Sequence, residues 1–355
     1  MQDNKKVLLG MSGGVDSSVA AILLKEQGYE VCGTTLELCK DSSCCNIDTY
    51  LEAKKICKTL GFEHFILKAS PEFQKYVVDD FINEYKNCHT PNPCIECNKY
   101  LKFGLMWEKA REMGCNYIST GHYAKTEYSE KYGRYVLKKS DNIKKDQTYV
   151  LYTIPKELIE HMVFPLGIFK DKEEVREIAR KFNFSVASRP DSEDICFIPD
   201  NDYKGYLERN AGFKSKEGNI VNKSGEILGK HTGLYKYTIG QRKGLGISYK
   251  EPLFVLGFNI IDNELIVGTE NDLYTKEFIV KDFNLLLFDY LNEPVDCEVK
   301  IRYSAQSAPC TITRIDDNQV KVTMKEKAKS VTPGQSAVFY IDDIVLGGGK
   351  IKEIL

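Results

Sequence analysis

A glycine- and serine-rich run near the start of the chain has the composition of a phosphate-binding loop. It lies between an apolar, strand-like stretch and a helical one, and its residues are Gly10, Met11, Ser12, Gly13, Gly14, Val15, Asp16, Ser17 and Ser18. At such a junction, backbone N–H groups and the N-terminus of a helix converge on an anion. Adjacent glycines let the backbone approach phosphate oxygens, and the three serines add hydroxyl donors. An ordinary turn capped by Asp16 would need only part of this pattern, so the run predicts nucleotide binding.

Three cysteines on two distant segments are candidates for thiolate chemistry or metal binding. Cys94 and Cys97 are separated by two residues in the proline-stiffened segment 89–98, which is predicted to enter a helix at about Lys99. This spacing lets both sulfur atoms face one point, and thiolates at a helix N-terminus have lowered pKa values. Cys196 lies far along the chain, between acidic residues and an apolar stretch.

The other cysteines have less specific interpretations. Cys39, Cys44 and Cys45 are close enough in sequence to form a further ligand group, and their role stays open. Single cysteines within strand or helix patterns are expected in the core, namely Cys32, Cys57, Cys115, Cys297 and Cys310. A zinc site is a further alternative that lacks a second paired motif, and it would use Cys88, His89, Cys94 and Cys97.

The elements that must position these residues alternate between strand and helix up to about residue 200. Strands are predicted at 7–10, 31–36, 63–67 and 117–120, and helices at 16–27, 49–60, 72–85, 100–113 and 172–182. This order predicts an α/β fold with a doubly wound parallel sheet. Ligands of such sheets lie at the carboxyl ends of the strands, so Leu36 and Gly121 are placed to flank an adenosine.

From Gly218 onward, strands with Gly, Asn and Asp turns dominate, and two small β-rich units are expected. The predicted domains are 1–204, 205–274 and 275–355. In the middle domain, the segments 230–237 and 241–243 interleave basic and aromatic residues, a composition suited to phosphate contacts and stacking on unpaired bases.

Composition sets outer limits on the class of protein. The 355 residues include 49 basic and 51 acidic side chains, a net charge of −2, and 42% are hydrophobic. These values are typical of a soluble globular chain of two or three domains, and near-neutral charge still allows a local basic face for nucleic acid. No stretch approaches the roughly 20 apolar residues that span a bilayer, and the N-terminus has no signal segment, so we expect a cytoplasmic protein without a membrane partner. Twelve cysteines in such a chain do not indicate a disulfide framework.

Several motifs together resemble one known family. The run contains no G-x-x-x-x-G-K-[ST], and its residues Ser12–Ser17 resemble instead the SGGxDS signature of the PP-loop ATP pyrophosphatases. Further segments are similar to the bacterial tRNA-specific 2-thiouridylase family of PP-loop enzymes: Ser119–Tyr123, Lys145–Tyr149, Tyr237–Gly246, Thr332–Tyr340 and the two cysteine segments. These motifs are spread over essentially the whole chain.

The resemblance implies ATP-dependent 2-thiolation of the wobble uridine of tRNA. ATP would adenylate the C2 oxygen with loss of pyrophosphate, and sulfur would then displace AMP. The ATP site would comprise residues 10–17 with Leu36 and Gly121, and Asp16 would help to hold Mg²⁺. The tRNA is the implied partner, together with a sulfur donor such as a cysteine desulfurase or a sulfur-relay protein.

The resemblance also assigns residues to the RNA and to the sulfur. The tRNA contacts would be His122, Lys145, Asp146, Gln147, Arg302, Tyr303 and Gln335, while Asn92, Pro93 and Cys94 occupy the segment that touches the target base. Cys97 aligns with the family's nucleophile and Cys196 with its persulfide cysteine.

The chain departs from the family pattern at Cys94, where the family carries an aspartate that could act as a general acid or base. Sulfur could still move as a persulfide on Cys196. Alternatively, Cys94, Cys97 and Cys196 could hold three irons of a [4Fe–4S] cluster and leave the fourth iron open for hydrosulfide. Two other functions remain: a PP-loop synthetase acting on a small acid, and an RNA-binding adaptor without catalysis. The intact loop 12–18 argues against the adaptor, and the tRNA-contact motifs argue against the small-acid enzyme.

Overall fold

The computed structural model describes residues 5–39, 47–188, 195–198 and 200–355. Cys44 and Cys45 lie outside the described residues, as does most of the acidic segment before Cys196. Within the described ranges, no helix is both long enough and apolar enough to span a bilayer.

The N-terminal part is built on a five-stranded parallel sheet, which confirms the predicted α/β fold class. Its strand order is β3-β2-β1-β4-β7, with bounds Lys6–Gly10 for β1, Glu30–Glu37 for β2, His64–Lys68 for β3, Tyr117–Ser119 for β4 and Met162–Val163 for β7. The sequence order reverses between β1 and β4, because β2 and β3 lie on one side of β1 and β4 and β7 on the other. Such a switch point is where ligands bind in doubly wound sheets.

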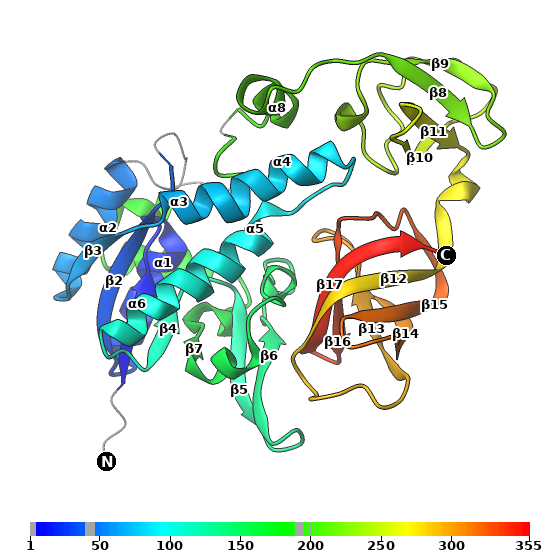
Figure 1. Ribbon diagram of the computed structural model, residues 1–355. Coiled ribbons are helices and arrows are strands. Elements are labelled where there is room, and N and C mark those ends of the chain that lie inside the picture. Colours follow the sequence, from blue (N-terminus) through cyan, green and yellow to red (C-terminus); the bar gives the residue numbers. More distant parts are fainter. Residues whose placement is uncertain (1–4, 40–46, 189–194, 199) are drawn as a thin grey trace.

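Helices cover both faces of this sheet (Figure 1). Side chains alternate between the faces of a strand. Val7 and Leu9 therefore pack with the helices of one face, and Leu8 packs with those of the other. On the first face lie α1 (Val15–Glu26), α2 (Ile47–Leu60) and α7 (Lys172–Lys181), and on the second lies α6 (Met106–Glu112).

Two longer helical segments are each made of several pieces. The first runs through α3 (Ser70–Phe73), π-helical turns at Gln74–Val78 and α4 (Asp79–Lys86). The second runs through α5 (Pro93–Glu96), π-helical turns at Cys97–Leu105 and α6. Short 3₁₀ turns lie at Thr148–Val150, Lys156–His161, Pro165–Ile168, Ser185–Ser188, Leu234–Lys236 and Glu270–Leu273.

The two β-rich units follow in the second half of the chain. Helix α8 (Tyr203–Ala211) leads to a four-stranded sheet of order β10-β11-β8-β9, formed by Gly218–Asn222 (β8), Ile227–His231 (β9), Phe254–Asn259 (β10) and Glu264–Gly268 (β11). Six further strands then form a barrel, which the pairing of its first and last strands closes. They are Tyr274–Leu285 (β12), Val295–Lys300 (β13), Ala308–Arg314 (β14), Gln319–Lys329 (β15), Ser336–Ile341 (β16) and Ile344–Ile354 (β17).

A hairpin that the sequence patterns did not predict joins the first unit to the barrel. Strands β5 (Ala124–Ser129) and β6 (Arg134–Lys139) follow β4, and β6 pairs with β17 through Lys138 and Ile344. The first and third units thus share one sheet. The division into 1–204, 205–274 and 275–355 remains a proposal.

The same two units also share a hydrophobic core. Tyr149 and Tyr152 are 0% and 2% exposed and lie in one cluster with Tyr340 of the barrel. The Tyr149 hydroxyl donates to the Ser336 carbonyl oxygen at 2.8 Å, and the Thr148 and Tyr340 hydroxyls lie 3.2 Å apart. Contacts with the barrel therefore stabilise the N-terminal unit.

This shared core predicts that a barrel mutation destabilises the N-terminal unit. Tyr340→Ala should lower the free energy of unfolding by about 3 kcal/mol or more, because it empties a fully buried aromatic site. Trp107, the single tryptophan, lies on α6 and reports on the N-terminal unit by fluorescence during urea unfolding. Tyr290→Ala is the matched control because Tyr290 is 71% exposed. An unchanged Trp107 transition in Tyr340→Ala would show that the two units fold independently.

Candidate active site

The phosphate loop connects β1 to α1 at the carboxyl edge of the sheet. Its start is fixed by β2, since the Met11 N–H donates to the Thr34 carbonyl and the Thr35 hydroxyl donates to the Met11 carbonyl, both at 2.7 Å. The Ser12 N–H donates to the Ser17 hydroxyl oxygen at 3.2 Å. These bonds wrap the loop around the first turn of α1.

The serines of this loop differ in their environments. Ser12 is exposed, whereas Ser17 and Ser18 are 3% and 0% exposed. The Ser18 hydroxyl donates to the Gly14 carbonyl at 2.7 Å and so helps to hold the start of the helix. Of the three predicted hydroxyl donors, Ser12 is therefore the one presented to solvent.

Two glycines allow close backbone contacts around the loop. Gly13 has a φ of +67°, and a Cβ there would lie 2.4 Å from the Thr49 carbonyl oxygen. Gly121, which follows β4, packs so closely on α1 that a Cβ would lie 2.8 Å from the Ser17 backbone nitrogen. Leu36 lies near the end of β2, partly buried against two core clusters. The predicted adenosine-flanking positions thus border the loop, and their role in binding ATP stays a prediction.

A lysine that sequence reasoning missed lies at the phosphate loop. The Lys172 ammonium is 2.7 Å from Asp16 Oδ2, and the Tyr123 hydroxyl donates to Asp16 Oδ1 at 2.9 Å. Lys172 is the first residue of α7, where Asp171 forms a capping box with Glu174. The capping pattern could have located the helix start, but nothing in the local sequence links position 172 to position 16.

The environment of Asp16 fits the predicted magnesium. Its side chain is 31% exposed, and each carboxylate oxygen keeps acceptor capacity beyond the one contact described above. Carboxylate oxygen is a preferred ligand of Mg²⁺, which takes most of its remaining ligands from water and phosphate.

The cysteine helix begins six residues earlier than predicted. It starts at Pro93 rather than at about Lys99, because Asn92 caps it by accepting the Cys94 N–H at 3.2 Å and proline suits the first helical position. Cys94 and Cys97 therefore lie within the helix and not in an extended loop. Cys94 is exposed, and Cys97 is 8% exposed.

Cys97 and Cys196 belong to one hydrophobic cluster although they lie far apart in the sequence. Cys97 packs there with Phe81 and Phe197, and Cys196 is partly buried against the same cluster. The residues at the end of β2 also reach it, including Cys39.

Cys94 lies within electrostatic range of a barrel residue. Burial, and after it the charge of Asp146, raises the pKa of Tyr303, and Cys94 is a further group close enough to raise it. The barrel residue Tyr303 is 43% exposed, so an exposed thiol and an exposed phenol lie near each other beside the cysteine helix.

The cluster and zinc alternatives stay predictions. Throughout the part of the chain that the structure describes, no three His, Cys, Asp or Glu side chains are grouped as a metal site. His89 of the zinc alternative instead places its Nδ1 2.7 Å from Glu84.

Several predicted RNA contacts are engaged within the protein. Asp146 is 6% exposed and accepts hydrogen bonds from the Ser140 N–H and the Thr148 hydroxyl, at 3.0 and 2.6 Å. Burial is the main cause that raises the pKa of Asp146. Gln147 accepts the Tyr123 N–H at 2.9 Å, while Lys145 is half-buried. In this tripeptide, Asp146 and Gln147 fix the loop.

His122 lies in an aromatic pocket. It is 7% exposed, its ring centroid is 6.0 Å from that of Phe103 and 6.2 Å from that of Phe164, and its Nδ1 is 2.6 Å from the Thr120 hydroxyl. Burial holds its pKa well below the usual histidine range, so the ring is neutral.

Two predicted RNA contacts of the barrel also hold protein segments. Arg302 donates to the Ser330 carbonyl at 2.7 Å and to the Thr332 hydroxyl at 2.9 Å. The Gln335 side chain donates to the Thr90 carbonyl, immediately before the cysteine helix. Their roles toward tRNA stay predictions.

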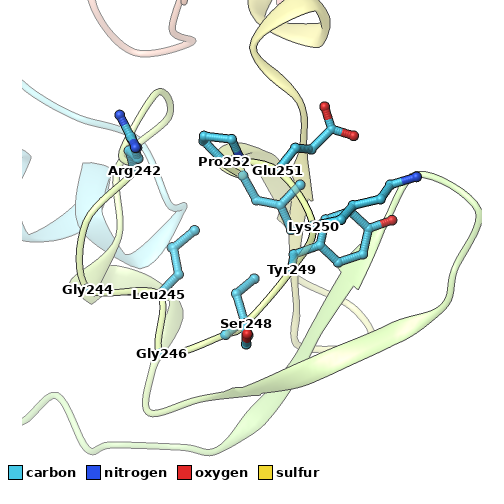
Figure 2. Close-up of a pocket in the computed structure, with 11 residues that line it drawn as sticks. Arg242, Gly244, Leu245, Gly246, Ser248, Tyr249, Lys250, Glu251 and Pro252 are labelled. Carbon is cyan, nitrogen blue, oxygen red and sulfur yellow. The ribbon is translucent and has the colours of Figure 1, made fainter.

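The middle domain presents a polar cavity of about 470 Å³ (Figure 2). It is formed by the loop that follows the basic segment 241–243, with Arg242 on one side and Tyr249 and Lys250 on the other. Tyr249 is 40% exposed. Of the basic and aromatic segments 230–237 and 241–243, only Arg242 lines this cavity, and their role in binding RNA stays a prediction.

The known proteins to which the chain is similar align with nearly its whole length. Family models match residues 5–200 as a tRNA methyl transferase HUP domain, 204–269 as a tRNA methyl transferase PRC-barrel domain and 275–351 as an aminomethyltransferase beta-barrel domain. The chain is 47% identical over 359 residues to the tRNA-specific 2-thiouridylase MnmA of Clostridioides difficile, and the alignment covers 99% of each protein. It is 46% identical over 355 residues to the protein of the same name from Clostridium kluyveri, and this alignment covers 98% of this chain and 99% of that one.

Among solved structures, the U34-tRNA thiolase NcsA from Methanococcus maripaludis with its [4Fe-4S] cluster is 20% identical, with a TM-score of 0.35. It covers 59% of this chain and 68% of that one. This likeness is too slight to bear on the site.

The geometry of the loop predicts a selective effect of Gly13→Ala. The new Cβ would collide with the Thr49 carbonyl and move the loop, so ATP affinity should fall at least tenfold in an equilibrium binding measurement. Gly28→Ala is the matched control because Gly28 has a φ of +80° and no atom within 4 Å of the new Cβ. This control should lose about 1 kcal/mol of stability and keep its ATP affinity. Equal ATP affinity in both variants would contradict the placement of the nucleotide.

Proposed function

The chain belongs to the tRNA-specific 2-thiouridylase family, and from this premise we propose that its sulfur reaches the wobble uridine of tRNA through a persulfide on Cys196 that Cys97 resolves. The protein is a tRNA-uridine 2-sulfurtransferase that uses ATP. The proposal concerns how its residues divide the reaction.

The phosphate loop and Lys172 serve the activation step. The C2 oxygen of the uridine attacks the α-phosphorus of ATP, and the bond to pyrophosphate breaks. The loop N–H groups and the Lys172 ammonium, which lies 2.7 Å from Asp16, offset the charge that grows on the leaving group. A magnesium ion held by Asp16 and the phosphates would add to this charge compensation.

The buried Cys97 and the partly buried Cys196 serve the sulfur step. The terminal sulfur of the Cys196 persulfide bonds to C2 of the adenylated base, and AMP leaves with the former C2 oxygen. The Cys97 thiolate then attacks the Cys196 sulfur and breaks its bond to the transferred sulfur, which stays on the uridine. The resulting Cys97–Cys196 disulfide is reduced by a cellular thiol before a sulfur donor, such as a cysteine desulfurase or a relay protein, reloads Cys196.

One observation carries this proposal: Cys97 and Cys196 pack into one cluster at the end of β2, beside the strand that anchors the phosphate loop. A disulfide requires the two Cα atoms to lie within about 7 Å, so a shared cluster is a precondition for the resolving step. Cys94 is exposed, and a role as third iron ligand is not needed in this scheme.

We further propose that tRNA lies across the barrel and the middle domain. Lys145 and Cys94 both lie within electrostatic range of Tyr303, and the loop around Arg242 and Tyr249 supplies a further basic and aromatic surface. Contacts over several domains can offset the few kcal/mol needed to pull the target base out of its stack. A synthetase that acts on a small acid would not need these surfaces, and an RNA-binding adaptor without catalysis would not need Lys172 at the phosphate loop.

The activation step predicts that Lys172→Met abolishes adenylation. Pyrophosphate release that depends on tRNA should fall by about 100-fold or more, because a charge contact present in the transition state is lost. Lys170→Met, at an exposed lysine two residues earlier, should release pyrophosphate at the normal rate. Normal release by Lys172→Met would remove Lys172 from the site, and release without tRNA would favour a small-molecule synthetase.

The sulfur step predicts that Cys94→Asp remains active. After anaerobic purification, this variant and the unaltered protein should both form 2-thiouridine and contain no stoichiometric iron, whereas Cys97→Ser should form none. If Cys94, Cys97 and Cys196 instead hold a cluster, the unaltered protein should be brown with about four irons per chain. Loss of both iron and activity in Cys94→Asp would overturn the persulfide scheme.

A further inference from the structure

A lysine of the barrel enters a group of carboxylates in the N-terminal unit. Lys350, on β17, has a side chain that is only 23% exposed, and its ammonium lies 3.0 Å from Glu96 Oε1. Glu84 and Asp80 on α4 lie 3.7 and 3.9 Å from the same ammonium. Lys350 is thus the cation of a four-residue group that bridges two domains.

This group is held together by charge and by restricted access to water. Burial disfavours the charged lysine, but the three carboxylates, Glu96 first among them, raise the pKa of Lys350 above its usual range. Burial also raises the pKa of Asp80 to about 6. At 3.0 Å the contact with Glu96 is direct, and the neighbouring cavity of about 10 Å³ has room for one water molecule at most. Without Lys350, the three carboxylates would lose the cation that they share, although Glu84 also contacts His89 Nδ1 at 2.7 Å.

Glu96 lies in the cysteine helix, between Cys94 and Cys97. Its side chain is 10% exposed, and it is directly followed by the residue that the proposed sulfur step requires. Because a helix residue moves with its neighbours, a restraint on Glu96 is a restraint on the direction of Cys97.

The barrel also holds the start of this segment. Gln335 donates to the Thr90 carbonyl, and Gly334 packs against His89 so closely that a Cβ would lie 2.5 Å from the His89 Cβ. The segment that precedes the cysteine helix and the helix itself are therefore both fixed to the barrel.

We propose that Lys350 is a positioning residue for sulfur transfer: through its ion pair with Glu96, the barrel holds the cysteine helix so that Cys97 meets the persulfide on Cys196. The inference rests on the proposed function. It gives the barrel a part in the chemistry beyond any part in binding RNA. Lys350 lies outside the motifs that mark the family resemblance, whereas its partner Glu96 lies within one of them.

The test separates activation from sulfur transfer in single turnovers with persulfide-loaded protein. Lys350→Met should release pyrophosphate in the presence of tRNA within about twofold of the normal rate. Its yield of 2-thiouridine per pyrophosphate should fall at least tenfold, because activated uridine waits for a misplaced Cys97. Lys350→Arg should restore most of this yield. Lys352→Met is the matched control, since Lys352 lies on the same strand, is 43% exposed and contacts only barrel residues in the described structure, Glu353 and Gln319, both at 3.2 Å.

A second variant covers the case in which Lys350→Met does not fold. Glu96→Gln keeps the helix and leaves Lys350 with two carboxylates, and it should show the same fall in yield per pyrophosphate. An unchanged yield in either folded variant, or a parallel loss of pyrophosphate and 2-thiouridine, would overturn the inference.

Cys97→Ala, measured alongside, keeps the two hypotheses apart. If Cys97→Ala still forms 2-thiouridine, the proposed function fails. If it is inert while Lys350→Met and Glu96→Gln transfer sulfur normally, only the positioning role fails.

Discussion

The packing of the barrel against the parallel-sheet unit fixes the relative positions of the groups that we propose to act on RNA and sulfur. Tyr149 and Tyr152 of the sheet unit are buried because β16 of the barrel covers them. Both of their hydroxyl groups form hydrogen bonds with Ser336. A buried phenol without a partner would be costly, so ring packing and hydrogen bonding favour the same arrangement. With this contact in place, Lys350 reaches Glu96 and Tyr303 lies near Cys94.

Each half of the candidate site is completed by a residue from far along the chain. The phosphate loop has no lysine of its own, and α7 supplies Lys172 to Asp16. The cysteine helix has a buried thiol at Cys97, and a later segment brings Cys196 to the same cluster. Both long-range meetings follow from a doubly wound sheet, in which distant connections converge on the carboxyl edge. The ATP and sulfur halves meet at β2, which anchors the loop through Thr35 and ends beside the cysteine cluster.

Local sequence patterns predicted the repeating elements well, because a helix such as α1 or α7 carries its periodicity and end signals within a dozen residues. The same patterns missed contacts that depend on partners far away. The hairpin of β5 and β6 is completed by β17, about 200 residues later, so its stretch of sequence does not look like part of a barrel sheet. The cysteine helix starts earlier than predicted although Asn92 and Pro93 form a recognisable cap, because prolines occur both in extended loops and at the first position of a helix. Motif similarity placed Asp146 and Gln147 at the RNA, and it could not show that both side chains are engaged with Ser140, Thr148 and Tyr123.

The central claim is that sulfur passes through a Cys196 persulfide, and peptide mass spectrometry tests it most directly. The protein is loaded with a cysteine desulfurase and cysteine, mixed once with ATP and tRNA, and digested under non-reducing conditions. The account predicts one extra sulfur on the Cys196 peptide before mixing, and a Cys97–Cys196 disulfide in equal amount to 2-thiouridine after it. Formation of 2-thiouridine with an unmodified Cys196 peptide at both times would contradict the account.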